Sequence, residues 1–114
     1  NQEITVINNE KIEINGIVFS GVTYHDTEDA SGLSKNLDVL SLEASKVNIL
    51  LKHKPTLHSV LETYPIDLVV SGHTHRAQMW PFSLVTYMIF GKYVYGRVDT
   101  NNLISITTSG VGSW

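Results

Sequence analysis

The chain has 114 residues, of which 42% are hydrophobic and 17% charged, a balance typical of a folded globular domain rather than of a disordered segment. Eight basic and eleven acidic residues give a formal net charge of −3, so the chain lacks the basic field on which nucleic-acid binding usually depends. With no cysteine, it can form neither a disulfide nor a thiolate metal site.

The N-terminal part of the sequence predicts short β-strands. Runs rich in β-branched residues, with period-two character, lie at 4–7, 11–14 and 17–20. Asn15-Gly16 separates the last two runs and predicts a two-residue hairpin turn, because both residues accept a positive φ. The polar segment 24–34 predicts a loop.

Helical and strand patterns alternate after this loop. Leucines at helical spacing predict a helix over 35–44 with Ser34 as its N-cap. Apolar runs predict buried strands over 47–51 and 66–70, with a second helix after Thr56 between them, and such a short crossover favours neighbouring parallel strands. Two further strands are predicted over 93–95 and 103–108, around a turn at 99–102.

Three of the five histidines directly follow the two predicted buried strands. His53 follows the first strand, and His73 and His75 follow the second. Open α/β sheets bind their ligands at this edge, and residues two apart in an extended segment face the same way, so the three imidazoles are expected to gather. Such a set suits Zn, Fe, Mn, Ni or Cu better than Mg or Ca. Hydrogen-bonded loop histidines are the alternative, and His58 is expected to be a partly exposed structural histidine.

Two blocks around these histidines resemble the last two signature blocks of the calcineurin-like metallophosphoesterases. They are LLKHKP at 50–55 and DLVVSGHTH at 67–75. Gln78 and the tail TSGVGSW at 108–114 are similar to a branch of bacterial phosphohydrolases that often carry an N-terminal membrane anchor. The resemblance covers residues 3–114. It implies that 1–114 is the C-terminal half of one such domain, an α/β sandwich of mixed β-sheets flanked by helices.

The resemblance also implies a binuclear metal site. His53 and His73 would ligate one divalent ion and His75 the other, the ions being Mn, Fe or Zn, and a bridging hydroxide would attack phosphorus. The family's Asp-x-His, its bridging Asp and its Asn-His-Asp block with the proton-donating histidine are absent from this sequence. No catalytic residue is therefore assigned to the chain. We expect it to bind metal weakly and to be inactive without the missing N-terminal half.

Three polar residues are candidates for contact with a phosphoester substrate. Arg76 stands where many relatives have glycine, and its planar guanidinium suits a phosphate; a solvated loop arginine is the alternative. His25 and Asp26 lie where relatives have a loop near the active site, although a polar surface loop is the simpler interpretation. Lys52 and Lys54 flank His53 and are expected to point to solvent or toward another face.

The aromatic stretch that begins at Trp80 and Phe82 has two interpretations. It either packs in the core or forms an apolar lip that contacts a lipid tail or a membrane interface, where aromatic side chains are favoured. The expected partners are a phosphoester, lipid-linked or nucleotide-like, together with the missing N-terminal half and further copies of the chain, since half a sandwich leaves apolar faces uncovered. The alternative function is a non-catalytic scaffold of the same fold that binds proteins.

Overall fold

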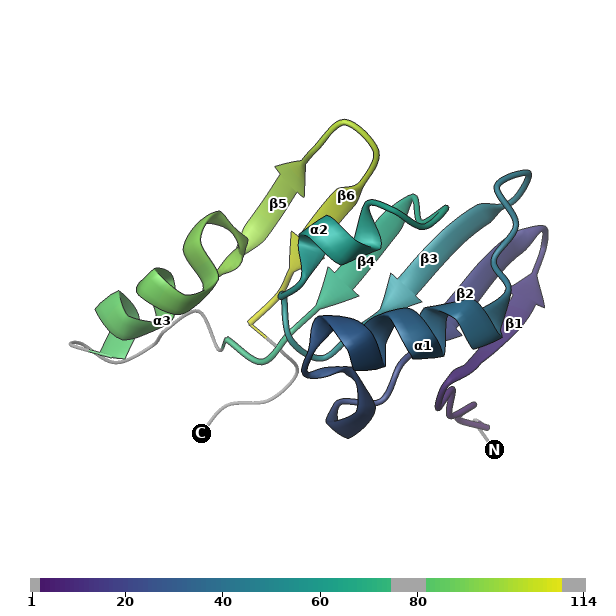
Figure 1. Cartoon of the computed structure of the whole chain (residues 1–114), viewed down its shortest axis with the longest axis horizontal. Coiled ribbons are helices and arrows are strands. Elements are labelled where there is room, and N and C mark those ends of the chain that lie inside the picture. Colours follow the sequence, from purple (N-terminus) through teal and green to yellow (C-terminus); the bar gives the residue numbers. More distant parts are fainter. Residues whose placement is uncertain (1–2, 75–81, 110–114) are drawn as a thin grey trace.

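A computed structural model describes residues 3–74 and 82–109 of the chain and shows one mixed β-sheet flanked by helices (Figure 1). The strand order is β1-β2-β3-β4-β6-β5. The four inner strands run parallel, and the two edge strands pair antiparallel with their neighbours. The strands are β1 (Glu10–Ile14), β2 (Ile17–Gly21), β3 (Val47–Leu51), β4 (Leu68–Ser71), β5 (Gly96–Asp99) and β6 (Ile104–Thr107). The expected α/β class is confirmed.

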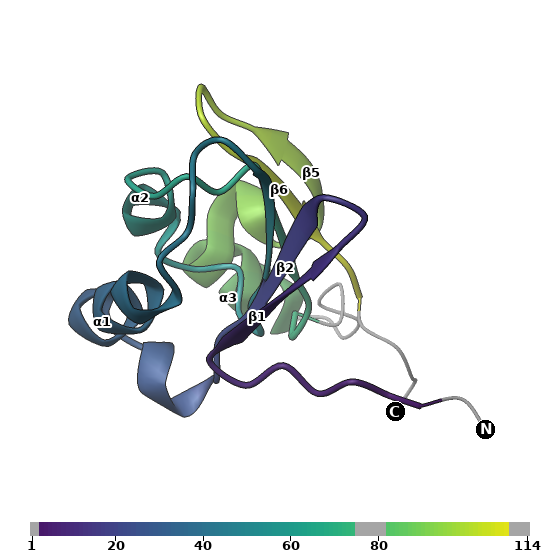
Figure 2. The same ribbon diagram turned by 90° about the vertical axis from the view of Figure 1, so that its right-hand side faces the viewer.

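Helices α1 and α2 lie together on one side of this sheet, whereas α3 extends from one end of the molecule (Figures 1 and 2). The α-helices are α1 (Ala30–Leu40), α2 (His58–Leu61) and α3 (Phe82–Phe90), and the 3₁₀ helices are η1 (His25–Thr27) and η3 (Gly91–Tyr93). No helix in the described ranges has both the length and the apolar character to cross a membrane.

The core lies between the sheet and these two helices. One stripe of α1 is fully buried, because its three leucines recur three and four residues apart. They pack against Leu50 of β3 and Val69 of β4, whose neighbours in the strands are less buried. The buried leucines of α1 are Leu33, Leu37 and Leu40. This packing fixes β3 and β4 beside each other and so fixes the position of the loops that follow them.

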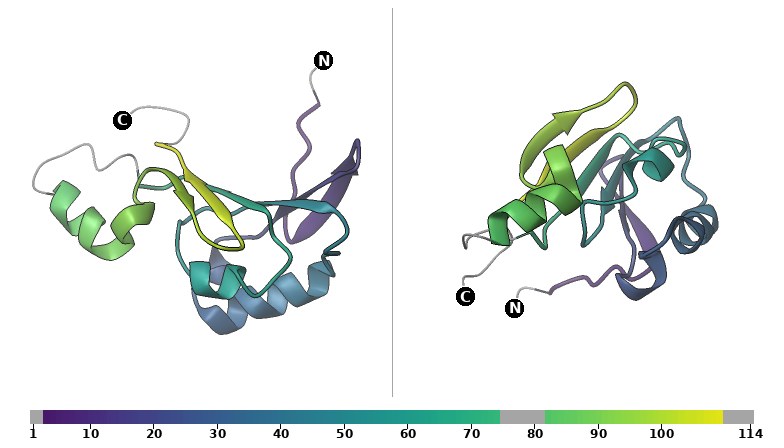
Figure 3. Two further views of the ribbon diagram at one scale, coloured as in Figure 1. Left: turned by 90° about the horizontal axis from the view of Figure 1, so that it is seen from above. Right: turned by 60° about the vertical axis from the view of Figure 1, so that its left-hand side comes forward.

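The opposite side of the sheet is apolar, and no helix within residues 3–74 and 82–109 covers it. Side chains on this side alternate with the buried ones along each inner strand, and every one of them is at least partly exposed. Figure 3 shows the sheet from two further directions, with α1 and α2 on one side only. We call this surface the open sheet face; it consists of Ile12, Ile14, Ile17, Phe19, Val47, Ile49, Leu51, Leu68, Val70, Ile104 and Ile106.

Two predicted features of the sheet are confirmed, the hairpin turn and one pair of parallel neighbours. Asn15 and Gly16 have φ values of 51° and 81° and form the tight turn between β1 and β2. β3 and β4 are parallel neighbours, as the short crossover predicts. The strand predicted at 4–7 is wrong, because the structure has no strand there.

The predicted helix boundaries are wrong by several residues. The first helix begins at Ala30 instead of residue 35, because Asp29 is the N-cap and its carboxylate accepts a hydrogen bond from Gly32 N at 2.7 Å. It ends at Leu40, since Ser41 takes a left-handed conformation with φ 49°. The second helix has only four residues.

The predicted strand at 93–95 is also wrong. This segment includes the end of η3, and β5 begins after it at Gly96. Glycine is suited to that position because its φ is +89°, a conformation that other residues rarely adopt.

Candidate functional site

The loops after β3 and β4 bring two of the three predicted metal-binding histidines together. The Nε2 atom of His53 lies 2.9 Å from the Nδ1 atom of His73, and the ring centroids are 4.7 Å apart. This approach follows from the parallel register, in which Leu51 pairs with Val70, and from a hydrogen bond of 3.1 Å from Gly72 N to His53 O. Two imidazole nitrogens therefore lie within hydrogen-bond distance of each other at the carboxyl edge of the sheet, which also fits the alternative of hydrogen-bonded loop histidines.

The backbone after β4 is bent rather than extended. His73 has φ 70°, so the alternation expected for an extended segment does not apply at this position. Thr74 is buried, and its hydroxyl donates to Val94 O at 2.7 Å, which ties the bend to the segment before β5. His75, the third predicted ligand, lies outside the described residues. Within those residues, no cluster of three or more histidine, aspartate or glutamate side chains is placed to hold a metal ion.

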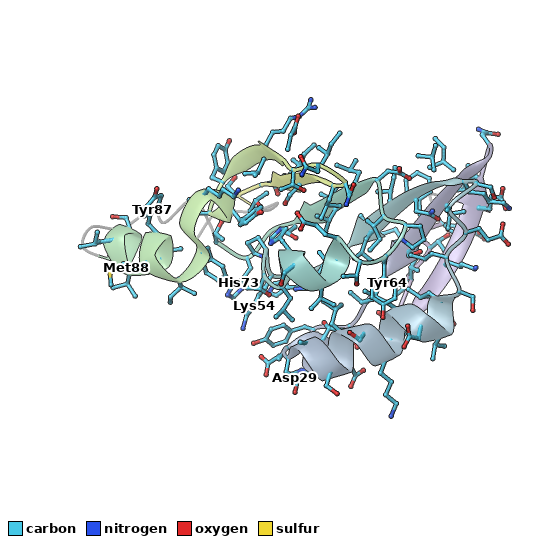
Figure 4. All side chains as sticks on the ribbon, turned by 45° about the horizontal axis from the view of Figure 1, so that its top comes forward. Asp29, Lys54, Tyr64, His73, Tyr87 and Met88 are labelled. Atoms are coloured by element: carbon cyan, nitrogen blue, oxygen red, sulfur yellow. The ribbon has the colours of Figure 1, made fainter. Side chains whose placement is uncertain are left out.

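Tyr24 and Lys54 support the ring of His53. The Tyr24 ring meets the imidazole edge-on at a centroid distance of 5.3 Å. Lys54 Nζ donates to the Tyr24 hydroxyl at 2.7 Å and lies 3.5 Å from a carboxylate oxygen of Glu28. The hydrogen bond to Tyr24 raises the pKa of Lys54. Figure 4 labels Lys54 and His73, which lie close together at this end of the sheet.

Lys52 is buried, so of its two expected orientations the one toward another face is right and the one toward solvent is wrong. Only 5% of the residue is exposed, and its Nζ donates to Lys54 O at 2.8 Å and to Thr56 Oγ1 at 2.9 Å. Burial lowers its pKa to about 8, with a smaller contribution from the charge of Lys54. The signal in the sequence was strand alternation: Lys52 follows Asn48 and Leu50 at spacings of two, so it continues the buried side of β3.

A cavity of about 290 Å³ lies beside the histidine pair, with His53 in its wall. Lys52 and Lys54 contribute polar wall, and Leu57, Ile89 and Phe90 contribute apolar wall from the loop before α2 and from the end of α3. We call this space the Lys52 cavity.

His25 and Asp26, two of the predicted substrate contacts, lie in η1. Asp26 accepts hydrogen bonds from Thr23 Oγ1 at 2.6 Å and from Asn9 Nδ2 at 3.3 Å, which lower its pKa. The His25 ring lies 5.1 Å from that of Tyr24. These contacts hold the N-terminal segment to the loop after β2, and a role in substrate binding stays a prediction.

Most of the remaining predicted contacts lie outside the described residues. Arg76 and Trp80 lie outside the described residues, as do Gln78 and the tail from 110 onward. Phe82 begins α3, but its side chain is not described. For the rest of α3, core packing is wrong: Leu84, Val85, Tyr87, Met88 and Ile89 are exposed, and Figure 4 shows Tyr87 and Met88 pointing away from the body of the molecule.

His58 is structural, as expected, but it is buried rather than partly exposed. Its ring stacks on Tyr93 at a centroid distance of 3.6 Å, and its Nε2 lies 3.0 Å from Ser105 Oγ. Burial lowers its pKa to about 4. His58 therefore joins α2 to β6 and η3 and takes no part in the histidine pair.

Several relatives of the chain among known proteins carry the same kind of name. No family model and no solved structure matches the chain. A protein of Helicobacter pylori strain J99 is 33% identical over 98% of the chain, and one of Campylobacter jejuni is 29% identical over 96%. A third, of Aquifex aeolicus, is 40% identical over 61% of the chain. All three are named as uncharacterised metallophosphoesterases.

The chain spans about a third of the length of these relatives, 31% for the Helicobacter protein and 30% for the Campylobacter protein. The similarity nevertheless runs through almost all of the chain, including the loops that carry His53 and His73. The sheet, the paired histidines and this similarity agree, and the chain belongs to the metallophosphoesterase family.

Proposed function

We propose that the chain contributes the histidine ligands of a metal-dependent phosphoesterase, as the C-terminal part of a longer catalytic domain. The observation that carries this proposal is the 2.9 Å approach of His53 Nε2 and His73 Nδ1 at the carboxyl edge of two parallel strands. The similarity to longer metallophosphoesterases supports it, because the chain corresponds to about a third of each.

The donor atoms fit the divalent metals of this chemistry. Two facing imidazole nitrogens suit Mn, Fe or Zn. His75 would add a third imidazole, and carboxylates from the rest of the protein would complete two ion sites. Bound divalent ions supply charge that holds phosphate oxygens and makes water a better nucleophile.

The residues around the pair orient its rings for this task. Tyr24, which accepts a hydrogen bond from Lys54, contacts the His53 ring from one side, and the Gly72–His53 backbone bond ties the loops after β3 and β4 together. Support of this kind usually raises metal affinity, because a ligand side chain that is already held in place loses less conformational entropy on binding. The chain thus preorganises one side of the metal site.

Calorimetric titration of Mn²⁺ and of Zn²⁺ into the chain tests the proposal. We expect weak binding, because two or three imidazoles without carboxylates hold a divalent ion poorly. His53→Ala and His73→Ala should each weaken it about tenfold or more. His25→Ala is the matched control, since it removes an exposed histidine that lies outside the pair.

Two results would contradict the proposal. Equal metal affinity in the His53→Ala and His73→Ala variants would show that the pair is not the site. Two tight sites in the chain alone would show that no further ligands are needed. If the longer protein binds Mn²⁺ or Zn²⁺ through neither histidine and hydrolyses no phosphoester, the non-catalytic scaffold is the better description.

A further inference from the structure

Among the residues that the structure describes, Lys52 is a buried cation with no carboxylate paired to it. Its ammonium has three N–H groups, and the described residues offer two acceptors, Lys54 O and Thr56 Oγ1. None of the ion pairs among these residues involves Lys52. Burying a charged group is costly unless it is paired and fully hydrogen-bonded, so a third acceptor that carries negative charge would stabilise it.

The Lys52 cavity is placed to supply that acceptor. Lys52 lines it, and so do Lys54 and Thr56, the two residues that accept hydrogen bonds from the Lys52 ammonium. Glu28, a carboxylate that also lines the cavity, is already paired with Lys54 Nζ at 3.5 Å. The polar part of the wall therefore favours an anionic group from a ligand.

The apolar part of the cavity wall favours a ligand that has an apolar group next to its anionic group. Leu57, Ile89 and Phe90 contribute aliphatic and aromatic surface, and the cavity volume of about 290 Å³ is at the lower end of the range for small-molecule sites. His53 belongs both to the cavity wall and to the histidine pair. A molecule in the cavity is therefore next to the atoms that would hold the reacting phosphate.

We propose that the Lys52 cavity binds the leaving group of the phosphoester, and that this group carries an anionic oxygen for Lys52 beside an aromatic or similarly flat apolar body. This inference rests on the proposed function. In the hydrolysis, water forms a new P–O bond, the P–O bond to the leaving group breaks, and the leaving oxygen receives the proton that the water loses. Lys52 binds a second, non-reacting anion of the leaving group and so selects substrates that have one.

Binding of phenylphosphonate to the metal-free chain tests the cavity, because this stable probe combines a flat ring with an anion. We expect it to bind about tenfold more tightly than inorganic phosphate, which lacks the ring, or benzyl alcohol, which lacks the charge. In an NMR titration, the amide signals that shift most should be those of Leu57, Ile89 and Phe90.

Two variants and one control identify the contacts. Lys52→Met keeps the length of the side chain and should weaken phenylphosphonate binding about tenfold. Lys35→Met removes an exposed lysine of α1 and should leave the affinity within about twofold. Ile89→Ser changes an exposed residue and should weaken phenylphosphonate but not phosphate, which keeps the test valid if Lys52→Met does not fold.

Equal affinity for phenylphosphonate in the chain and in a folded Lys52→Met or Ile89→Ser variant would overturn the proposal. His73→Ala separates the two proposals, because His73 is a member of the histidine pair but does not line the cavity. It should lower Mn²⁺ affinity and leave phenylphosphonate binding intact. If the chain binds phenylphosphonate but its metal affinity does not depend on the pair, the anion site stands and the phosphoesterase role fails.

Discussion

At the scale of single residues, His58 is held in its neutral form by its surroundings. The residue is 7% exposed, and its ring lies flat on Tyr93 with Nε2 3.0 Å from Ser105 Oγ. A protonated imidazole here would lose hydration and would also meet the positive charge of Lys52, which is why its pKa falls from 6.5 to about 4.

This shift predicts that the chain loses stability in mild acid. Between pH 6.5 and about 4 the unfolded chain takes up a proton at His58 and the folded chain does not, so the free energy of unfolding falls as the pH falls through this window. The loss approaches about 3 kcal/mol near pH 4 and then levels off. Urea unfolding between pH 7.5 and pH 4.5 measures it, with His58→Gln as the comparison. An equal loss in this variant would assign the acid sensitivity to other groups.

The sequence located some site residues and missed others for physical reasons. The approach of His53 and His73 follows from a general property of parallel strands, whose carboxyl ends meet at one edge, so it could be predicted. The left-handed backbone at His73 could not, because histidine has only a weak preference for it. Lys52 was missed because lysine is usually exposed, although its strand position indicated burial.

At the scale of elements, α1 shows how an N-cap decides where a helix begins. Asp29 and Ser34 are both acceptable caps by residue type, and the three leucines fit either start. The structure selects Asp29, whose carboxylate accepts from Gly32 N at 2.7 Å. Gly32 also lies so close to the backbone of Asp26 that a side chain there would collide with it. The early start is therefore fixed by local contacts of Asp29 and Gly32, which residue type alone does not distinguish from a start at Ser34.

The two candidate caps can be separated by substitution. Asp29→Ala should lower the free energy of unfolding by about 1 kcal/mol, since it removes the acceptor at the helix start. Ser34→Ala should change it by less than about 0.5 kcal/mol, because Ser34 lies inside the helix. Denaturant titrations followed by circular dichroism measure both. A larger loss of unfolding free energy in Ser34→Ala than in Asp29→Ala would instead support a helix that begins after Ser34.

α3 is a helix that the hydrophobic pattern of the sequence did not predict. Its half-buried side chains include Ser83 and Thr86, whereas its aliphatic side chains are exposed, the reverse of the usual amphipathic arrangement. A helix without an apolar stripe facing the core has no periodic signal in the sequence. Its last turn nevertheless brings Ile89 and Phe90 to the Lys52 cavity, so the element that the sequence could not predict shapes the site.

At the scale of the whole molecule, the helices in the described part of the chain cover only one side of the sheet. α1 and α2 bury the side that contains Leu50 and Val69, and the open sheet face stays accessible across four parallel strands (Figure 2). Apolar surface of this extent usually marks an interface, because leaving it in water costs free energy in proportion to its area. The sandwich that the resemblance to the calcineurin-like metallophosphoesterases implies would cover this face with a second layer. That layer stays a prediction.

An uncovered face predicts that the chain associates with copies of itself in solution. The double variant Ile49→Thr and Ile106→Thr places two hydroxyls in the middle of the open sheet face and keeps β-branched side chains, which suit a strand. It should remain monomeric in sedimentation velocity at concentrations where the unmodified chain sediments faster. Val39→Thr, at a 73% exposed position on α1, is the control and should associate like the unmodified chain. If the double variant associates as strongly as the unmodified chain, the contact between copies lies on α3 or at the sheet edges instead. If the unmodified chain is itself monomeric, the open sheet face does not drive association and the prediction is wrong.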